Sequence, residues 1–385
     1  MFLFLASFLS LYGGMHAYAL HRLKNAFNPS SHTVYGIAAL MVLMTFMPLL
    51  VRLFERSGYD TIAVTLAWPG YIWMGAIFLF ASALAAIDLT RLCVWLYLRR
   101  TASEMPQVLG AGLTCEIALL FCFAATIYSF FEARNIATEH LSVKSSKLPA
   151  SAGRIRVVQI SDVHLGLLVG EERLKRILRQ VKEARPDILV STGDLVDGRL
   201  NQEEKIDSHG HLAVMMAEIK PPLGMFAVIG NHEVYVGLRQ ALEFTSKAGF
   251  RVLRNETEQI GQHLSVTGAD DPAVTGMNAM ESYSPEIQLL KNADSSRFKL
   301  LLKHRPVVAK SGDGFFDLQL SGHSHQGQLF PFTLLVFLKY HLTGGTVKTG
   351  AGSLFHVSRG SGTWGPPLRF LAPPEVTIID IVPDK

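Results

Sequence analysis

The chain has 385 residues, of which 49% are hydrophobic and 18% charged, and its formal net charge is +4 at pH 7. This small charge, with no basic tract interleaved with aromatic residues, argues against a nucleic-acid partner. The charges are unevenly distributed. Residues 1–135 carry 8 of the 36 Lys and Arg and 6 of the 32 Asp and Glu, which leaves 28 and 26 for residues 136–385. The shift predicts a domain boundary near residues 133–137.

The first segment contains four apolar stretches, at residues 2–20, 34–51, 63–87 and 108–131. Each is long enough, or nearly so, to cross a hydrocarbon core of ~30 Å as a helix. We therefore predict a multi-pass membrane segment of four helices over residues 1–135. A cleaved signal peptide is disfavoured because no Lys or Arg precedes the first stretch and three more follow it. Buried helices of a soluble domain are disfavoured because so few charges separate the four stretches.

The side of the membrane that the remaining chain faces is undetermined, because the flanking Lys and Arg divide 3 against 4 or 5. One carboxylate, Glu116, lies within the fourth stretch. An intramembrane carboxylate is a candidate functional group. The alternative, which we favour, is a protonated or hydrogen-bonded side chain inside the four-helix bundle. Asp88 and Arg91, just after the third stretch, have the spacing of an i,i+3 ion pair.

A stretch rich in Ser and Lys follows, and we predict a linker at residues 136–153 and a catalytic domain at residues 154–385. Residues 155–160 alternate and β-branch like a strand, and an amphipathic helix pattern follows them. Further strands are predicted at 188–190, 226–229, 264–266, 299–302, 318–320 and 375–382, with a helix at 238–248. Strands and helices alternate at first and strands dominate later. This order predicts an α/β (α+β) fold of two packed β-sheets flanked by helices.

Five short motifs lie at the ends of predicted strands. They are Asp162-Val-His164, Gly193-Asp194-Leu-Val-Asp197, Gly230-Asn231-His232-Glu233, His304 in Lys-His-Arg-Pro, and Gly322-His323-Ser-His325. Their side chains offer imidazole, carboxylate and amide groups, and this region contains no Cys. Such a set suits divalent Mn, Fe or Zn. A single buried His is ordinarily a core residue, but five such motifs together favour a metal site.

These motifs resemble those of the calcineurin-like metallophosphoesterases, over roughly the last 235 residues. The resemblance implies two divalent metal ions, one held by Asp162, His164 and His325. The other would be held by Asn231, His304 and His323, and Asp194 would bridge the pair. His232 would be the catalytic imidazole, oriented by Asp197. Gln326 replaces the Gly expected in membrane-linked members, which concerns loop shape more than metal ligation.

The implied activity is metal-dependent hydrolysis of a phosphoric ester. A phosphate diester is anionic and repels hydroxide. Two metal ions about 4 Å apart can lower the pKa of a shared water and neutralise the phosphoryl oxygens. His232 is suited to protonate the leaving alkoxide because imidazole titrates near neutral pH.

Two later segments bear on the substrate. Residues 329–338 form an apolar run that is too short to span a bilayer. A buried strand and a lipid-facing surface are both compatible with this run. Residues 359–370 are rich in Gly and Pro and resemble the tail of membrane-linked members, and Arg359 is a candidate phosphate contact.

The membrane-linked branch of this family includes phosphodiesterases and hydrolases that act on UDP-diacylglucosamine. The resemblance therefore implies a phosphodiester or pyrophosphate substrate that is linked to a lipid. In an alternative hypothesis the four helices form a transport or signalling protein, and the phosphoesterase domain is regulatory. The intact set of metal and catalytic positions favours the enzyme.

Overall fold

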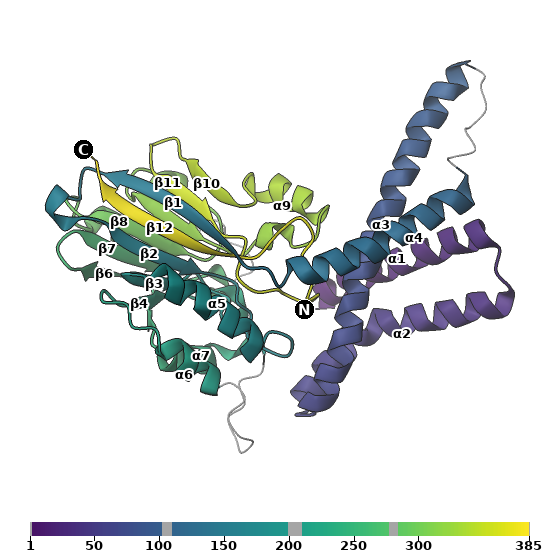
Figure 1. Cartoon of the computed structure of the whole chain (residues 1–385), viewed down its shortest axis with the longest axis horizontal. Coiled ribbons are helices and arrows are strands. Elements are labelled where there is room, and N and C mark those ends of the chain that lie inside the picture. The colour runs from purple at the N-terminus through teal and green to yellow at the C-terminus, as the bar shows by residue number, and fades with distance from the viewer. Residues whose placement is uncertain (1, 102–109, 199–209, 277–283, 385) are drawn as a thin grey trace. The chain divides into compact units, whose positions relative to one another are not determined.

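The computed structural model describes residues 2–101, 110–198, 210–276 and 284–384 (Figure 1). The chain divides into two compact units. Unit 1 is Met1–Phe131 with Gly365–Phe370, and unit 2 is Glu132–Trp364 with Leu371–Lys385. The boundary after Phe131 agrees with the change in charge density along the sequence.

The part of unit 1 that the structure describes forms four helices: α1 (Phe2–Phe27), α2 (Ser31–Arg56), α3 (Asp60–Thr101) and α4 (Ala111–Glu132). They share an apolar cluster that includes Tyr12, Met41, Ile77, Leu84 and Ala118. Among the described residues, α2, α3 and α4 are long and apolar enough to cross a membrane.

The prediction of four spanning helices is therefore corrected to three among the described residues. The first apolar stretch does form a helix, α1, whose second half carries the polar and charged residues His16, His21, Arg22, Lys24 and Asn25. His16 is 3% exposed, and its ring nitrogens contact the Trp73 indole N–H at 2.8 Å and the Thr45 hydroxyl at 3.3 Å. The fourth stretch was predicted to begin at residue 108, which lies outside the described residues.

The ionisable groups of unit 1 differ in their surroundings. Asp88 accepts a hydrogen bond of 2.6 Å from the Tyr18 hydroxyl and lies 2.9 Å from Arg22. Arg91 lies 3.9 Å away, which confirms the i,i+3 pair. Glu116 is exposed on α4 rather than enclosed by the helices. The predicted burial of Glu116 inside a bundle was therefore wrong.

The described residues of unit 2 form two six-stranded sheets (Figure 1). The first sheet has the order β1 (Ala137–Ser145), β12 (Glu375–Pro383), β2 (Ile155–Ile160), β3 (Ile188–Ser191), β4 (Met225–Ala227) and β5 (Arg251–Val252). The second has the order β10 (Gly345–Lys348), β11 (Leu354–Val357), β9 (Leu318–Ser321), β8 (Phe298–Lys303), β7 (Leu264–Ala269) and β6 (Glu256–Ile260). Strands β2 to β5 run parallel, as do β7, β8, β9 and β11.

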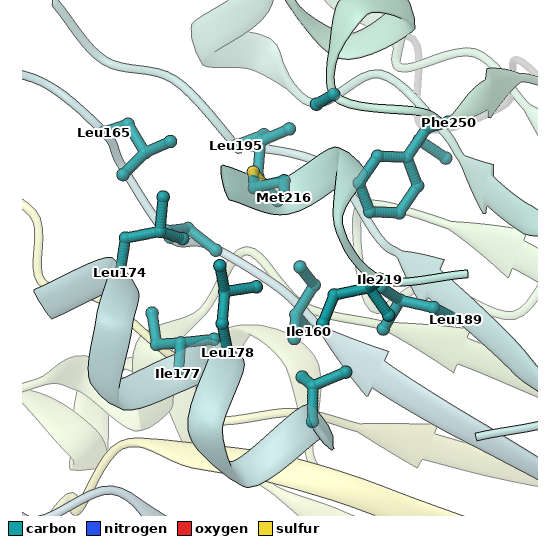
Figure 2. Packing of buried hydrophobic residues seen from close by; sticks show 14 of the residues in the cluster. Ile160, Leu165, Leu174, Ile177, Leu178, Leu189, Leu195, Met216, Ile219 and Phe250 are labelled. Atoms are coloured by element: carbon teal, nitrogen blue, oxygen red, sulfur yellow. The ribbon is translucent and has the colours of Figure 1, made fainter. Parts of the chain in front are cut away.

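The alternation of side chains along the strands of the first sheet fills two cores. Val157 and Val190 face an apolar cluster shared with Leu300 and Leu320 of the second sheet, so the two sheets pack face to face. The opposite face, which includes Ile160, is covered by α5 (Glu171–Ala184), α6 (Gly210–Ala217) and α7 (Asn231–Lys247). Figure 2 shows this second core, where the apolar side of α5 meets the sheet. The predicted α/β class with two sheets and flanking helices is confirmed.

The second sheet carries its own helices. The short helix α8 (Glu286–Asn292) packs through Leu290 against Leu301 and Phe316. After β9, residues 332–340 form α9 (Phe332–Tyr340). A buried strand was one of two interpretations of residues 329–338, and the structure shows an exposed helix instead: of its residues, Val336 is 7% exposed whereas Leu338 is 69% exposed.

The predicted linker at residues 136–153 is also corrected. Its first half is β1, which pairs in parallel with β12 from Ala137 opposite Glu375 to Ser145 opposite Pro383. Val143 and Leu148 are 3% and 2% exposed and belong to the core between the sheets. The Ser and Lys residues obscured this strand because β1 is an edge strand with one face exposed to solvent.

The edge strand generates a test. Val143→Ala should lower the free energy of unfolding of unit 2 by about 1–3 kcal/mol, because it removes two buried methyl groups. Lys144→Ala, a change at the exposed neighbour on the same strand, should alter it by less than about 0.5 kcal/mol. The measurement is a urea titration of the full-length chain in which hydrogen exchange in β2 and β12 reports the unfolding of unit 2. Equal midpoints for both variants would contradict the placement of β1.

Candidate metal centre

The topology of unit 2 brings the five motifs together at the ends of parallel strands. Strands β2, β3 and β4 run parallel, so the loops that follow them carry Asp162, Asp194 and Asn231 to one edge of the first sheet. In the second sheet, β8 and β9 are parallel, and His304 and His323 follow their ends. This arrangement is the usual position of ligand sites in sheets of parallel strands.

One group of converging donors consists of Asp162, His164 and His325. All three are less than 9% exposed, and one ligand atom from each lies within 4.8 Å of the others. The Nε2 atoms of His164 and His325 are 2.9 Å apart, and His325 Nε2 is 3.6 Å from Asp162 Oδ1. The Asp162 carboxylate is fixed by the Ser161 hydroxyl and by the backbone N–H of His323, which donate to it at 2.5 and 2.9 Å.

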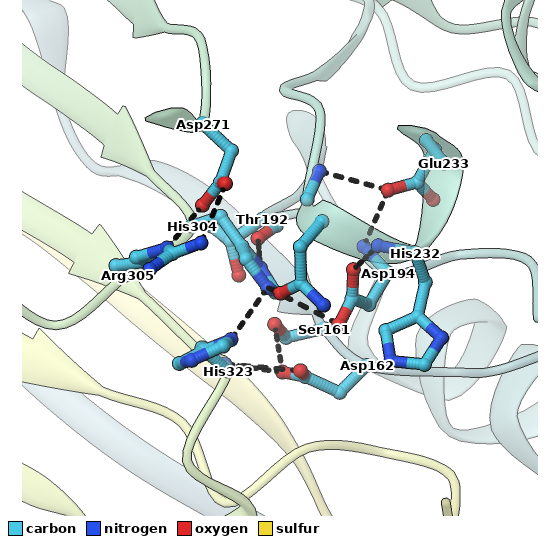
Figure 3. Close-up of polar contacts among 12 residues, drawn as sticks. Ser161, Asp162, Thr192, Asp194, His232, Glu233, Asp271, His304, Arg305 and His323 are labelled. Atoms are coloured by element: carbon cyan, nitrogen blue, oxygen red, sulfur yellow. Dashed lines mark hydrogen bonds and ion pairs between the residues drawn. The ribbon is translucent and has the colours of Figure 1, made fainter. Parts of the chain in front are cut away.

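A second group surrounds His304 (Figure 3). Its Nε2 lies 3.2 Å from Asp194 Oδ2, 3.2 Å from Asn231 Oδ1 and 3.1 Å from His323 Nδ1. On the other side of the ring, Nδ1–H donates to the carbonyl oxygen of Thr192 at 2.8 Å. This bond holds a proton on Nδ1, so Nε2 is the nitrogen that would coordinate a metal ion. The ring of His304 is completely buried.

Asp194 lies between the two groups. Its Oδ2 is 3.2 Å from His304 Nε2 and 3.8 Å from His164 Nε2, so one oxygen is within reach of both sets. Its Oδ1 accepts the backbone N–H of His232 at 2.9 Å. Buried carboxylate, imidazole and amide donors with no thiolate form a set that fits divalent cations.

The pKa values of the site reflect this concentration of buried charge. Burial raises the pKa of Asp162 to about 6. Burial would also raise the pKa of Asp194, but the neighbouring imidazoles of His304 and His232 hold it well below its ordinary value. Burial acts against protonation of His304, yet the Asp194 carboxylate raises its pKa to about 10. Burial lowers the pKa of His164 to about 4.

His232 and Asp197 form a separate pair beside these groups. The Nδ1–H of His232 donates to Asp197 Oδ1 at 2.6 Å. Burial opposes protonation of His232, but the carboxylates of Asp194 and Asp197 raise its pKa to about 9. The Trp364 ring lies edge-on to His232 at 5.7 Å and is half exposed. Gln328 holds Trp364 in place by two hydrogen bonds of 2.9 Å to its backbone.

Glu233 has an organising role that the sequence analysis did not assign. Its carboxylate accepts backbone N–H groups of Gly230, Asp194, Leu195 and Val196 at 2.6–3.4 Å. It therefore connects the loop after β3 with the start of α7. The signal was present in the sequence, since a Glu three residues after an N-cap position is the spacing of a capping box.

Close backbone approaches explain two glycines near the ligands. A Cβ atom at Gly230 would lie 2.1 Å from Asp194 Oδ1, and one at Gly362 would lie 2.0 Å from the carbonyl oxygen of Val163. Gly362 also donates its N–H to the carbonyl oxygen of Asp162 at 3.0 Å. The Gly-rich segment after Arg359 therefore supports the loop that carries Asp162 and His164.

The predicted metal ligands and the pair His232 and Asp197 all meet in this region, whereas Arg359 is engaged elsewhere. Its guanidinium pairs with Glu375 at 2.7 Å and with Glu139 at 2.5 Å, and its Nε donates to the carbonyl oxygen of Pro373. These carboxylates neutralise the charge of Arg359, which therefore has a structural role in unit 2. We therefore leave Arg359 out of the proposed site.

Comparisons with known proteins agree with this geometry. The calcineurin-like phosphoesterase family matches residues 155–327. An uncharacterized metallophosphoesterase of Aquifex aeolicus is 40% identical over 256 residues, which are 66% of this chain and 95% of that protein. An uncharacterized metallophosphoesterase of Helicobacter pylori is 34% identical over 60% of each chain.

A transmembrane protein with metallophosphoesterase domain from Danio rerio is 28% identical over 73% of this chain and 65% of its own length. The match to such proteins and the three apolar helices indicate membrane association. Because the family match contains all five motifs, the similarity covers the converging donors themselves. The chain belongs to the calcineurin-like phosphoesterase family and is a metal-dependent phosphoesterase.

Proposed function

We propose that this chain is a membrane-anchored phosphoesterase that uses two divalent metal ions to hydrolyse a phosphodiester or pyrophosphate bond. One ion would be held by Asp162, His164 and His325. The other would be held by Asn231, His304 and His323. Asp194 would bridge them. When bound, the ions supply a water of lowered pKa and neutralise the phosphoryl oxygens. The nitrogen and oxygen donors suit Mn, Fe or Zn.

The position of Asp194 Oδ2 is the observation that carries this proposal. It is within 3.8 Å of imidazole nitrogens from both donor groups, and each group has further donors of its own. A single metal ion would engage only one of the two groups of buried donors, whereas two ions with Asp194 between them would engage both.

His232 is proposed to act on the leaving group. The Asp197 carboxylate accepts a hydrogen bond from Nδ1–H and keeps the ring oriented, so Nε2 points away from this bond. The carboxylates of Asp194 and Asp197 raise the pKa of His232 to about 9, which favours the ring with a proton on Nε2. It can therefore donate this proton to an alkoxide as the bond to phosphorus breaks.

For the substrate we propose a lipid-linked phosphoester or pyrophosphate, a class that includes UDP-diacylglucosamine. Support comes from the three apolar helices, which would hold the catalytic unit at a membrane. The net charge of +4 and the lack of a basic tract make a polyanionic substrate unsuitable. Hydrolysis of membrane lipids by the purified chain, together with the lipids that accumulate in a deletion strain, tests this class. Turnover of soluble esters or nucleotides alone would contradict it.

The catalytic role of the metal centre can be separated from a role of the helices. In the purified full-length chain with Mn²⁺, Asp194→Asn should lower hydrolysis of bis(p-nitrophenyl) phosphate by at least about 100-fold. Glu116→Gln should leave this rate unchanged, because Glu116 is exposed on α4. If the chain were instead a transport protein with a regulatory phosphoesterase domain, its transport activity would be lost in Glu116→Gln and retained in Asp194→Asn.

His232 is tested by leaving groups of different basicity. His232→Ala should lower turnover of alkyl phosphodiesters by roughly 100-fold, because a basic alkoxide needs a proton when it departs. Nitrophenyl esters should lose much less, since nitrophenolate leaves without protonation. Metal content measured on the same samples should equal that of the wild type. Equal losses on both ester classes would assign His232 to positioning of the substrate or the metal.

A further inference from the structure

The helix α9 has an unusual surface for a helix of a folded catalytic unit. Its sequence is Phe-Thr-Leu-Leu-Val-Phe-Leu-Lys-Tyr, and one of its nine residues, Val336, is buried. Leu334, Leu335, Phe337 and Leu338 are 53–69% exposed, and Phe332 is 46% exposed. A helix that is apolar on nearly all sides is normally covered. The exposed side chains therefore require an apolar environment that unit 2 does not supply.

The charges around α9 indicate which environment this is. From Leu318 to Pro374 the sequence contains no Asp or Glu, whereas residues 136–385 contain 26 in total. The same 57 residues include four cations, of which Lys339 and Lys348 are exposed. Lys339 closes α9, and Lys348 ends β10, where Val347 is 42% exposed. Within this stretch the exposed charged side chains are cations, and apolar side chains beside exposed cations are complementary to a bilayer surface that contains anionic lipids.

We propose that α9 inserts into the surface of the bilayer as an interfacial helix, as a second membrane contact made by the catalytic unit itself. A protein partner would be expected to meet a polar rim of mixed charge, which this stretch lacks. The three apolar helices of the same chain would keep a bilayer at high effective concentration, so a short helix is sufficient for docking. The proposed insertion rests on the membrane association of the chain and not on a lipid substrate.

The insertion would affect the metal centre because α9 is attached to it. The loop with His323 and His325 leads directly into α9, and the Thr333 hydroxyl donates to the carbonyl oxygen of Gln326 at 2.7 Å. At the other end of the helix, the Tyr340 ring lies 6.2 Å from the His323 ring. Docking of α9 would therefore hold the metal centre at the level of lipid phosphates.

A fluorescence experiment tests the insertion without reference to activity. The three native cysteines are replaced by Ser, and Leu335→Cys or Leu338→Cys is labelled with an environment-sensitive dye. The control is Val214→Cys on α6, a site of the same unit with 54% exposure against 57% for Leu335. The full-length chain is reconstituted in phosphatidylcholine vesicles with increasing phosphatidylglycerol and with spin-labelled acyl chains as quenchers.

The proposal predicts blue-shifted emission at residues 335 and 338 and quenching at least about two-fold stronger than at residue 214. The quenching should increase with the anionic lipid fraction. Equal quenching at all three sites would overturn the proposal. A blue shift without quenching, dependent on the protein-to-lipid ratio, would also overturn it and would assign the face to a second copy of the chain.

Hydrolysis rates on a vesicle-borne and a soluble substrate distinguish membrane docking by α9 from the proposed phosphoesterase activity. Leu335→Asp with Leu338→Asp should lower hydrolysis of a vesicle-borne phosphoester by roughly 10-fold and leave hydrolysis of a soluble nitrophenyl ester unchanged. Val214→Asp should change neither rate. Unchanged rates on both substrates in the double variant would contradict docking through α9. Absence of phosphoesterase activity in the wild type would refute the proposed function, while the quenching result would still decide the inference.

Discussion

The Glu233 carboxylate is the constraint on which the arrangement of the candidate site depends. It is 3% exposed and accepts four backbone N–H groups from two separate loops. Burial raises its pKa to about 7, and the N–H groups of Gly230 and Leu195 act in the opposite direction by stabilising the ionised form. With the loops held in this way, Asp194 is directed toward both donor groups and His232 toward Asp197. The reactive side chains are thus positioned by hydrogen bonds to the backbone as well as by strand ends.

The loops also hold their ligands in a conformation that most residues avoid. Asp162, His164, Asp194, His323 and His325 all have φ between 48° and 70°. Residues other than Gly, Asn and Asp rarely adopt this left-handed region, and each such residue costs on the order of 1–3 kcal/mol. Gln326 has φ of 54° as well, a conformation that favours Gly, the residue that the family resemblance leads one to expect here. Strain concentrated on the three histidines among them is consistent with selection for ligand geometry over stability.

The sequence predicted the parts of the fold that follow directly from apolar patterns. Strands β2, β3, β8 and β9 were recognised because each is buried on both faces and is followed by a polar motif. The strand β1 was missed because a Ser- and Lys-rich edge strand has the composition of a linker. The surroundings of Arg359 and Glu116 could not be read from the sequence, because both depend on residues distant along the chain. Arg359 pairs with Glu139 and Glu375, and Glu116 lies on a face of α4 that the other helices do not cover. The helix α9 has no periodicity that separates it from a strand, since both of its faces are apolar.

The central claim is that Asp194 joins two metal ions, and metal titration by calorimetry tests it most directly. The full-length chain should bind two Mn²⁺ per molecule, and Asp194→Asn should bind fewer while remaining folded. Because the pKa of His304 is raised to about 10, binding must displace its proton, and the apparent affinity should increase from pH 6 to pH 9. Buffers of different ionisation enthalpy should report this proton release. At most one ion in folded wild-type protein, or two ions retained by Asp194→Asn, would contradict the account.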